Sequence, residues 1–107
     1  MSKRVKLVKN NICGKWIRHV RKGLYDKQHP KMTQEELSAK LQVLGLKIDR
    51  TALSRIESGA RILSDIEVAC FASALNVPLD FLFFGVDGTL PEITEFVSLV
   101  AEEEARI

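Results

Sequence analysis

The sequence has few of the residues that build disulfide scaffolds, metal centres or membrane spans. Its 107 residues include two cysteines, Cys13 and Cys70, and they form no CxxC pair, so neither a disulfide framework nor a zinc ribbon is indicated. The two histidines, His19 and His29, have no Asp, Glu or Cys at the spacing of a metal or nucleophile site. No long apolar run marks a membrane span or a signal peptide. We therefore expect no enzyme activity, no metal or other cofactor, no membrane contact and a place in the cytoplasm.

Charge, in contrast, is plentiful and unevenly divided along the chain. Residues 1–63 hold 15 Lys and Arg against 5 Asp and Glu, whereas residues 64–107 hold 1 against 9, so the two parts carry +10 and −8. A basic half beside an acidic half suggests that one face of the molecule meets a polyanion, the alternative being two solvated faces that balance. The first segment, residues 1–11, holds four of the basic residues and predicts either a basic arm or a frayed terminus.

Helical spacing of apolar residues predicts three helices in the basic half. The first covers residues 12–24, where apolar side chains recur every three or four positions. The second covers about residues 33–44, because Thr33 and Glu36 have the spacing of a capping box. A third, about residues 50–58, begins after an aspartate that can cap it and ends at a glycine. The second and third helices with the turn between them have the arrangement of a helix-turn-helix motif.

The rest of the chain predicts three further helices and no strand. Ser64 or Asp65 opens a fourth helix with an apolar stripe at helical spacing. Pro78 suits the first turn of a short fifth helix that ends at Phe84. Residues 85–107 are predicted to form a turn and a C-terminal amphipathic helix. A chain of this length can bury one modest core, so the predicted fold class is all-α.

The stretch FLFFGVDGTL, residues 81–90, resembles the opening motif of the haloacid-dehalogenase-like phosphatases. Such an enzyme needs two acidic groups and a sheet to hold them. Here Gly85 stands where the nucleophile belongs, Asp87 is the one acidic residue, and no alternation of strands and helices surrounds them. We therefore interpret GVDG, residues 85–88, as a turn after the fifth helix in which Gly85 and Gly88 supply special backbone angles.

A second resemblance lies in three segments, MTQEELSAKL, DRTALSRIESGAR and IEVACFASALNVPLDFL. Together they resemble the DNA-binding domain of Cro and the phage repressors, also called XRE, over residues 12–84. The resemblance implies a five-helix, phage-repressor-like domain, here with a basic arm (residues 1–11) before it and an added C-terminal helix after it. It also implies a sequence-specific transcriptional regulator that binds double-stranded DNA, most simply a repressor.

The resemblance further implies roles for particular residues of the third helix. In this family the helix enters the major groove by its amino end. An arginine can donate to both O6 and N7 of guanine, and a threonine methyl can touch the methyl of thymine. The alternative is a solvated helix face without readout. The residues at base-reading positions are Arg50, Thr51, Ser54 and Arg55.

One further position, Gln34, matches a phosphate contact of the family, and two others match a structural pair. Arg21 and Glu57 correspond to an ion pair that joins the first helix to the third. The link between the first two helices is longer than is usual, and the segment LQVLGLKID carries about one extra helical turn, which leaves the assignment among the base-reading positions open. The expected phosphate contacts are Gln34, Thr33, Lys47 and Arg61.

A small domain that reads a few base pairs needs a second copy to find one site, so a homodimer on a palindromic operator is expected. An antitoxin or another protein-interaction module that uses the acidic C-terminal half to hold a protein partner is the alternative function. A bacterial chromosome, a phage or a mobile element would suit the family equally. The surface expected for pairing, unless it only completes the monomer core, comprises Phe81, Phe84, Ile93, Phe96, Val97 and Val100.

Overall fold

The computed structural model describes residues 9–90, and the structural statements below concern that part of the chain. Within it there is no strand, and the predicted all-α fold class is confirmed. The helices are α2 (Gly14–Arg21), α3 (Gln34–Val43), α4 (Arg50–Glu57), α5 (Asp65–Leu75), α6 (Leu79–Phe84) and a short 3-10 helix, η1 (Gly85–Asp87).

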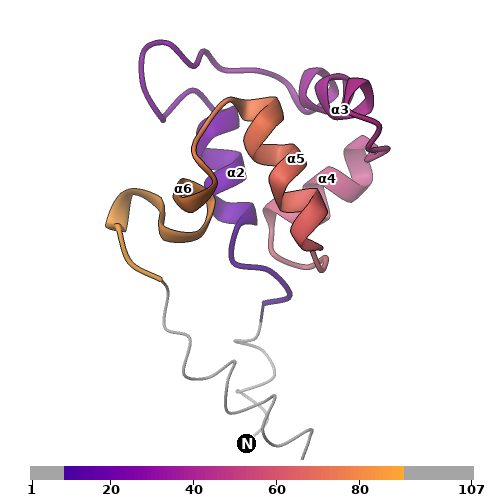
Figure 1. Cartoon of the computed structure of the whole chain (residues 1–107). Coiled ribbons are helices and arrows are strands. Elements are labelled where there is room, and N and C mark those ends of the chain that lie inside the picture. Colours follow the sequence, from indigo (N-terminus) through magenta and orange to yellow (C-terminus); the bar gives the residue numbers. More distant parts are fainter. Residues whose placement is uncertain (1–8, 91–107) are drawn as a thin grey trace, which may run out of the picture.

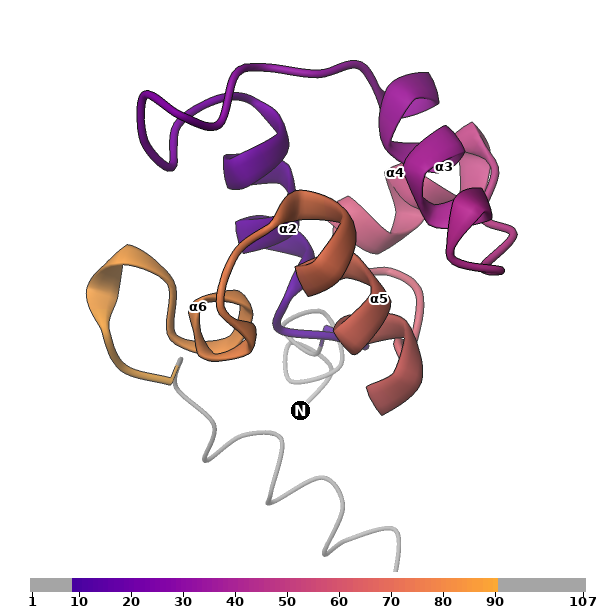
Figure 2. The same cartoon turned by 45° about the horizontal axis from the view of Figure 1, so that its top comes forward.

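The helices enclose one core, with the helix-turn-helix pair at one end. In Figures 1 and 2, α3 and α4 lie side by side at one end of the molecule and α6 lies at the other, with α2 and α5 between them. The linker, residues 22–33, arches along the edge of the molecule from α2 to α3. α2 packs against α4, α5 and α6, so it is the helix on which the recognition end of the molecule rests.

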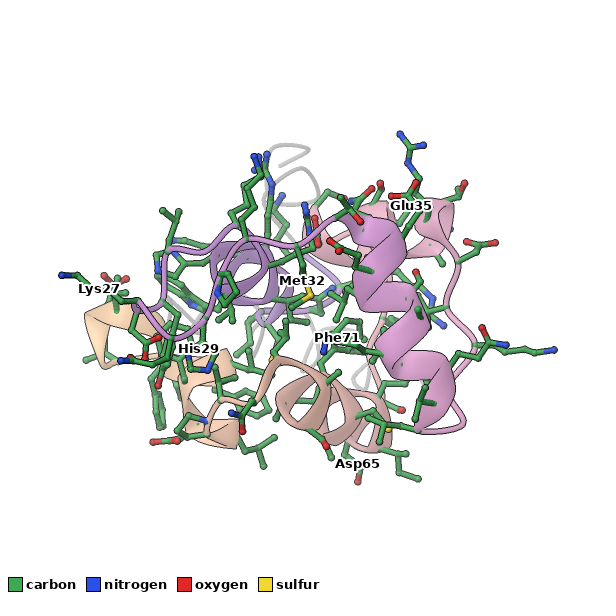
Figure 3. All side chains as sticks on the ribbon, turned by 90° about the horizontal axis from the view of Figure 1, so that it is seen from above. Lys27, His29, Met32, Glu35, Asp65 and Phe71 are labelled. Atoms are coloured by element: carbon green, nitrogen blue, oxygen red, sulfur yellow. The ribbon has the colours of Figure 1, made fainter. Side chains whose placement is uncertain are left out.

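Each of the five α-helices contributes fully buried apolar side chains to the core. Phe71 of α5 lies in the middle of the molecule, as Figure 3 shows. Full burial of one such side chain stabilises a fold by about 1.5–3 kcal/mol. The largest of these buried side chains are Phe71, Ile17, Leu37, Leu41, Leu53, Ile56, Leu82 and Val20.

The predicted starts of α3, α4 and α5 are confirmed in detail. Thr33 and Glu36 form a capping box at α3, with the Thr33 hydroxyl accepting the Glu36 N–H at 3.0 Å and the Glu36 carboxylate accepting the Thr33 N–H at 2.6 Å. Ser64 and Glu67 form a second capping box at α5, which settles the start of that helix in favour of Ser64. The carboxylate of Asp49 accepts a backbone N–H in the first turn of α4 at 2.8 Å. Local sequence thus determines where these helices begin.

Two boundaries were predicted wrongly. The first helix was expected over residues 12–24 but spans Gly14–Arg21, and Leu24, expected on its apolar face, is 63% exposed. The cause is Gly23, which has φ +79° and reverses the chain into the linker. Pro78 is the N-cap of α6 and not part of its first turn.

Within the stretch that resembled a phosphatase motif, GVDG forms a tight turn after α6, as predicted. α6 ends at Phe84, η1 follows, and Gly85 and Gly88 have φ +63° and +72°. A β-carbon on Gly85 would lie 1.8 Å from the Trp16 ring, so only glycine fits against this side chain. The first eight residues of the expected arm lie outside the described residues, as does the expected C-terminal helix with Ile93, Phe96, Val97 and Val100.

Candidate nucleic-acid interface

A six-residue turn, residues 44–49, separates α3 from α4 and accommodates the extra length that the sequence showed. Gly45 has φ +90°, and the Leu46 N–H donates to the Leu41 carbonyl at 3.0 Å, which closes the end of α3. Ile48 is 4% exposed and anchors the turn in the core. The turn therefore has a defined path, and α4 begins at Asp49 on the outside of the molecule.

α4 divides into a buried side and an exposed side. Leu53 and Ile56 have no exposed surface and belong to the core. The side chain of Arg50 is 72% exposed and forms one ion pair at the surface, 3.5 Å from Glu35. An exposed pair of this kind contributes about 0–1 kcal/mol, so it leaves Arg50 able to exchange its partner. All four residues at the predicted base-reading positions lie on the exposed side of the helix, namely Arg50, Thr51, Ser54 and Arg55.

A buried ion pair holds α4 on α2 behind that side. Arg21 Nε donates to Glu57 Oε2 at 2.6 Å and Arg21 Nη2 donates to Glu57 Oε1 at 2.9 Å. The two side chains are 9% and 4% exposed. Arg21 Nη1 also donates to the Met32 carbonyl in the linker, at 3.1 Å. A buried pair requires such additional partners, and here they join α2, α4 and the end of the linker.

Gln34, a predicted phosphate contact, directs its side-chain amide toward α4. Its Nε2 lies 3.2 Å from both Ser54 Oγ and Glu57 Oε1. The Ser54 hydroxyl donates in turn to Gln34 Oε1, at 3.3 Å. The amide thus links the start of α3 to the middle of α4, and Ser54 shares its hydroxyl with this contact.

The other predicted phosphate contacts occupy different settings. Thr33 is exposed, and its hydroxyl caps α3. Lys47 is exposed in the turn and lines, with Arg50, a hollow of about 540 Å³ between α3 and the start of α4. Arg61 is half-buried, and its Nη2 lies 3.1 Å from Glu67 Oε2. Burial acts to raise the pKa of Glu67, but hydrogen bonds from Ser64 and Arg61 outweigh it and the pKa is lowered from 4.5.

An open groove of about 600 Å³ lies between α2, the linker, the start of α3 and α4. Glu35 and Glu57 contribute negative charge to it, and each is paired with an arginine. Of its four cations from α2 and the linker, Arg21 is paired with Glu57. The other three, Arg18, Lys22 and Lys31, take part in none of the ion pairs formed within residues 9–90. The groove therefore presents unneutralised positive charge beside the exposed side of α4. Its lining includes Arg18, Lys22, Lys31, Gln34, Arg50 and Ser54.

Sequence reasoning did not select Arg18, Lys22 and Lys31 as site residues. Arg18 on α2 and Lys22, the C-cap of that helix, are four positions apart, and the sequence showed them only as part of an ordinary solvated helix face. What makes them part of a site is the groove that they share with α4, and that depends on how α2 and α4 pack.

Of the residues expected at a dimer surface, the structure describes Phe81 and Phe84. Phe81 is half-buried, with its ring centroid 4.7 Å from that of Tyr25 and 5.8 Å from that of Trp16. Phe84 is 37% exposed. Phe81 therefore belongs to the packing of a single chain, whereas Phe84 presents part of its ring to solvent.

Two capped helices, a defined turn and an outward-facing basic helix beside a cationic groove define a helix-turn-helix DNA-binding protein. The chain belongs to the helix-turn-helix family of the Cro and phage-repressor type, whose sequence pattern matches residues 27–82, more than half of the chain. It is thus a DNA-binding regulator by class. Searches of curated proteins and of solved structures returned no match.

Within residues 9–90 no single helix is long and apolar enough to cross a membrane. Asp65–Leu75 and Leu79–Asp87 meet the criterion only jointly, across a bend of 109°.

Proposed function

We propose that the chain regulates transcription by reading a specific DNA sequence with the exposed side of α4. The observation that carries this proposal is the shared groove, in which base-reading candidates of α4 lie beside cations of α2 and the linker. In this arrangement α4 enters the major groove amino end first, with Arg50, Thr51 and Arg55 toward the base edges.

The cations around α4 hold the DNA backbone. Arg18, Lys22 and Lys31 approach the phosphates of one strand from the groove, and Lys47 approaches from the turn before α4. These contacts supply affinity and register without sequence information. Gln34 and Arg61 already have partners within the protein, so either side chain would divide its hydrogen-bond donors between a phosphate and those partners.

The regulator acts as a homodimer on a palindromic operator and represses by occupying it. This follows from size, because one helix reads only a few base pairs and a single site in a genome requires more. The pairing surface includes Phe84 and the residues after it. Such a regulator belongs in the cytoplasm of a bacterium, encoded by the host, a phage or a mobile element.

Selection from a pool of random DNA duplexes at near-physiological salt tests this proposal. The wild-type chain is expected to enrich an inverted repeat with half-sites about one helical turn apart. The double variant Arg50→Glu, Arg55→Glu is expected to enrich nothing. Lys27→Glu is the matched control, since Lys27 is exposed on the linker and does not line the groove.

The outcomes separate the two functions that the sequence left open. Enrichment by the wild type and the control, and none by the double variant, supports readout by α4. No enrichment by the wild type overturns the proposal and favours a protein-interaction module that acts through the acidic half. If all three proteins enrich the same sequence equally, residues outside α4 read the DNA.

A further inference from the structure

Asn11, just before α2, uses its whole side-chain amide to join three segments. Its Nδ2 donates to the Arg61 carbonyl at 2.7 Å and to the Ile56 carbonyl at 3.1 Å. Its Oδ1 accepts the Gly14 N–H at 2.6 Å. A single side chain thus connects the start of α2, the last turn of α4 and the loop after α4. All three hydrogen bonds are shielded in part from solvent.

The two preceding residues extend the same contact along the loop. The backbone N–H of Asn10 donates to the Gly59 carbonyl at 2.8 Å, and its side chain donates to the Ala60 carbonyl at 2.7 Å. Lys9 Nζ donates to the Ser58 carbonyl at 3.1 Å. The last carbonyls of a helix have no partner within the helix. In the last turn of α4, Asn11 supplies a partner to the Ile56 carbonyl. Lys9 and Asn10 donate to carbonyls of residues 58–60, after the helix, and the contacts of Lys9 and the Asn10 side chain, unlike those of Asn11, are exposed.

The approach of α2 to α4 at this point leaves no spare room. A β-carbon on Gly14 would lie 1.8 Å from the Ile56 carbonyl oxygen and 2.9 Å from its carbon. Cys13, the N-cap of α2, offers no side-chain hydrogen bond to the first turn. Asn11 therefore bonds to both the Gly14 N–H and the Ile56 carbonyl, at a point where α2 and α4 lie close together.

α4 depends on such contacts for its orientation. It has eight residues, and an isolated helix of that length is not stable in water. The Arg21–Glu57 pair holds a side chain of its last turn. Asn11 holds the backbone of the same turn, so the two contacts together restrain both sliding and rotation of α4 on α2.

We propose that Asn11 is a positioning residue for DNA recognition: it holds the carboxyl end of α4 on α2 and so sets the angle at which Arg50, Thr51 and Arg55 face the base edges. The inference rests on the proposed function of α4 in sequence readout. If the contact only stabilised the fold, its loss would lower the fraction of folded protein and so weaken binding to every duplex by the same factor. A positioning contact changes the preference for the selected sequence over other duplexes.

Asn11→Asp and Asn11→Ala test the proposal in the full chain. Asn11→Asp keeps an acceptor for the Gly14 N–H but loses both donors to Ile56 and Arg61. Asn10→Ala is the matched control, because it removes one exposed hydrogen bond to the loop and none to α4. The two measurements are the ratio of dissociation constants for a random duplex and the wild-type-selected duplex, and amide hydrogen exchange of α4 without DNA.

Both Asn11 variants are expected to lower the ratio about tenfold and to speed exchange in the last turn of α4. Each leaves the Arg61 carbonyl without its donor and the Ile56 carbonyl with the Gly59 N–H alone. Asn10→Ala is expected to change the ratio less than about twofold. An unchanged ratio in a folded Asn11 variant overturns the positioning role. Because exchange is measured without DNA, unaltered exchange in α4 overturns it even if the wild type selects no sequence. The wild-type selection, in contrast, tests the proposed function alone.

Discussion

At the scale of single residues, the exposed side of α4 depends most on buried contacts between α4 and α2. Arg21 and Glu57 are almost fully buried, and their charges are balanced by each other, by the Met32 carbonyl and by the Gln34 amide. A buried pair adds little net stability over apolar packing, but loss of one partner leaves the other charge without compensation. The exposed pair between Arg50 and Glu35 has no such consequence, because water replaces either partner.

Single and double replacement of the buried pair are therefore expected to differ. Glu57→Ala should lower the free energy of unfolding by about 3–5 kcal/mol, since it leaves the Arg21 guanidinium buried without a carboxylate. The double variant Arg21→Met, Glu57→Leu should recover most of that loss. Urea denaturation of the three proteins measures the effect. A double variant as unstable as Glu57→Ala would contradict this account of the pair.

At the scale of the element, the linker is docked on the molecule by His29. Its Nδ1 lies 2.5 Å from Asp26 Oδ1 and its Nε2 lies 2.8 Å from the carbonyl of Asn76, the C-cap of α5. Figure 3 shows His29 reaching from the linker toward this side of the molecule. Both partners are acceptors, so the imidazolium, with an N–H on each nitrogen, satisfies both of them. The hydrogen bond to Asp26, followed by that to Asn76, raises the pKa of His29 above 6.5.

Stability is accordingly expected to depend on pH through the linker. A folded-state pKa above the unfolded value means that the contribution is complete below about pH 6.5 and is lost as pH rises through the folded pKa. The pKa of Asp26 is lowered from 3.8, chiefly by its hydrogen bond with His29, so its contribution is constant over this range. Lys31, Glu36 and Lys40 line the same hollow as His29.

The measurement is the free energy of unfolding of the wild type and of His29→Gln between about pH 6 and pH 8. The wild type should lose stability over this interval, and the variant should show a flatter profile because glutamine does not titrate there. Asp26→Asn should also flatten the profile, since it removes the carboxylate that favours the charged ring. Parallel profiles for wild type and His29→Gln would show that the ring does not titrate in this contact.

At the scale of the whole molecule, the uneven charge of the chain makes the face around α4 positive, and DNA phosphates are its expected partner. Five basic residues of the first half line the groove beside α4, whereas α5 and α6 begin with acidic first turns. Neutralising DNA phosphates releases bound counterions, so affinity falls as salt rises, in proportion to the number of phosphate contacts. The same cations should therefore act on every duplex alike, and only α4 should distinguish sequences.

Two substitutions separate the contribution of the phosphate contacts from that of sequence readout by α4. Lys22→Gln should reduce the slope of log affinity against log salt by about 0.9, equally for selected and random duplexes. Arg55→Gln should cost about 1–3 kcal/mol on the selected duplex and relax its sequence preference. Lys27→Gln, outside the groove, is the control for a lost surface charge. Affinity that did not change with salt would contradict DNA binding through these cations.

Several features of the site were open to prediction because they depend on short-range chemistry. The capping boxes at Thr33 and Ser64 and the cap at Asp49 involve residues three positions apart, so their spacing identifies them. Leu24 was predicted wrongly for a related reason. Its spacing continued the apolar stripe, but Gly23 had already reversed the chain.

The sequence alone determined the all-α class, the starts of α3, α4 and α5, the helix-turn-helix order and the exposed side of α4, since periodicity and caps act within a few residues. Only the tertiary structure decided that Arg18, Lys22 and Lys31 share a groove with α4 and that Asn11 holds its last turn. Asn11 and Ile56 are 45 positions apart, and a hydrogen bond across that separation has no periodic signal. It exists because α2 and α4 pack closely enough at Gly14 for one side-chain amide to reach both.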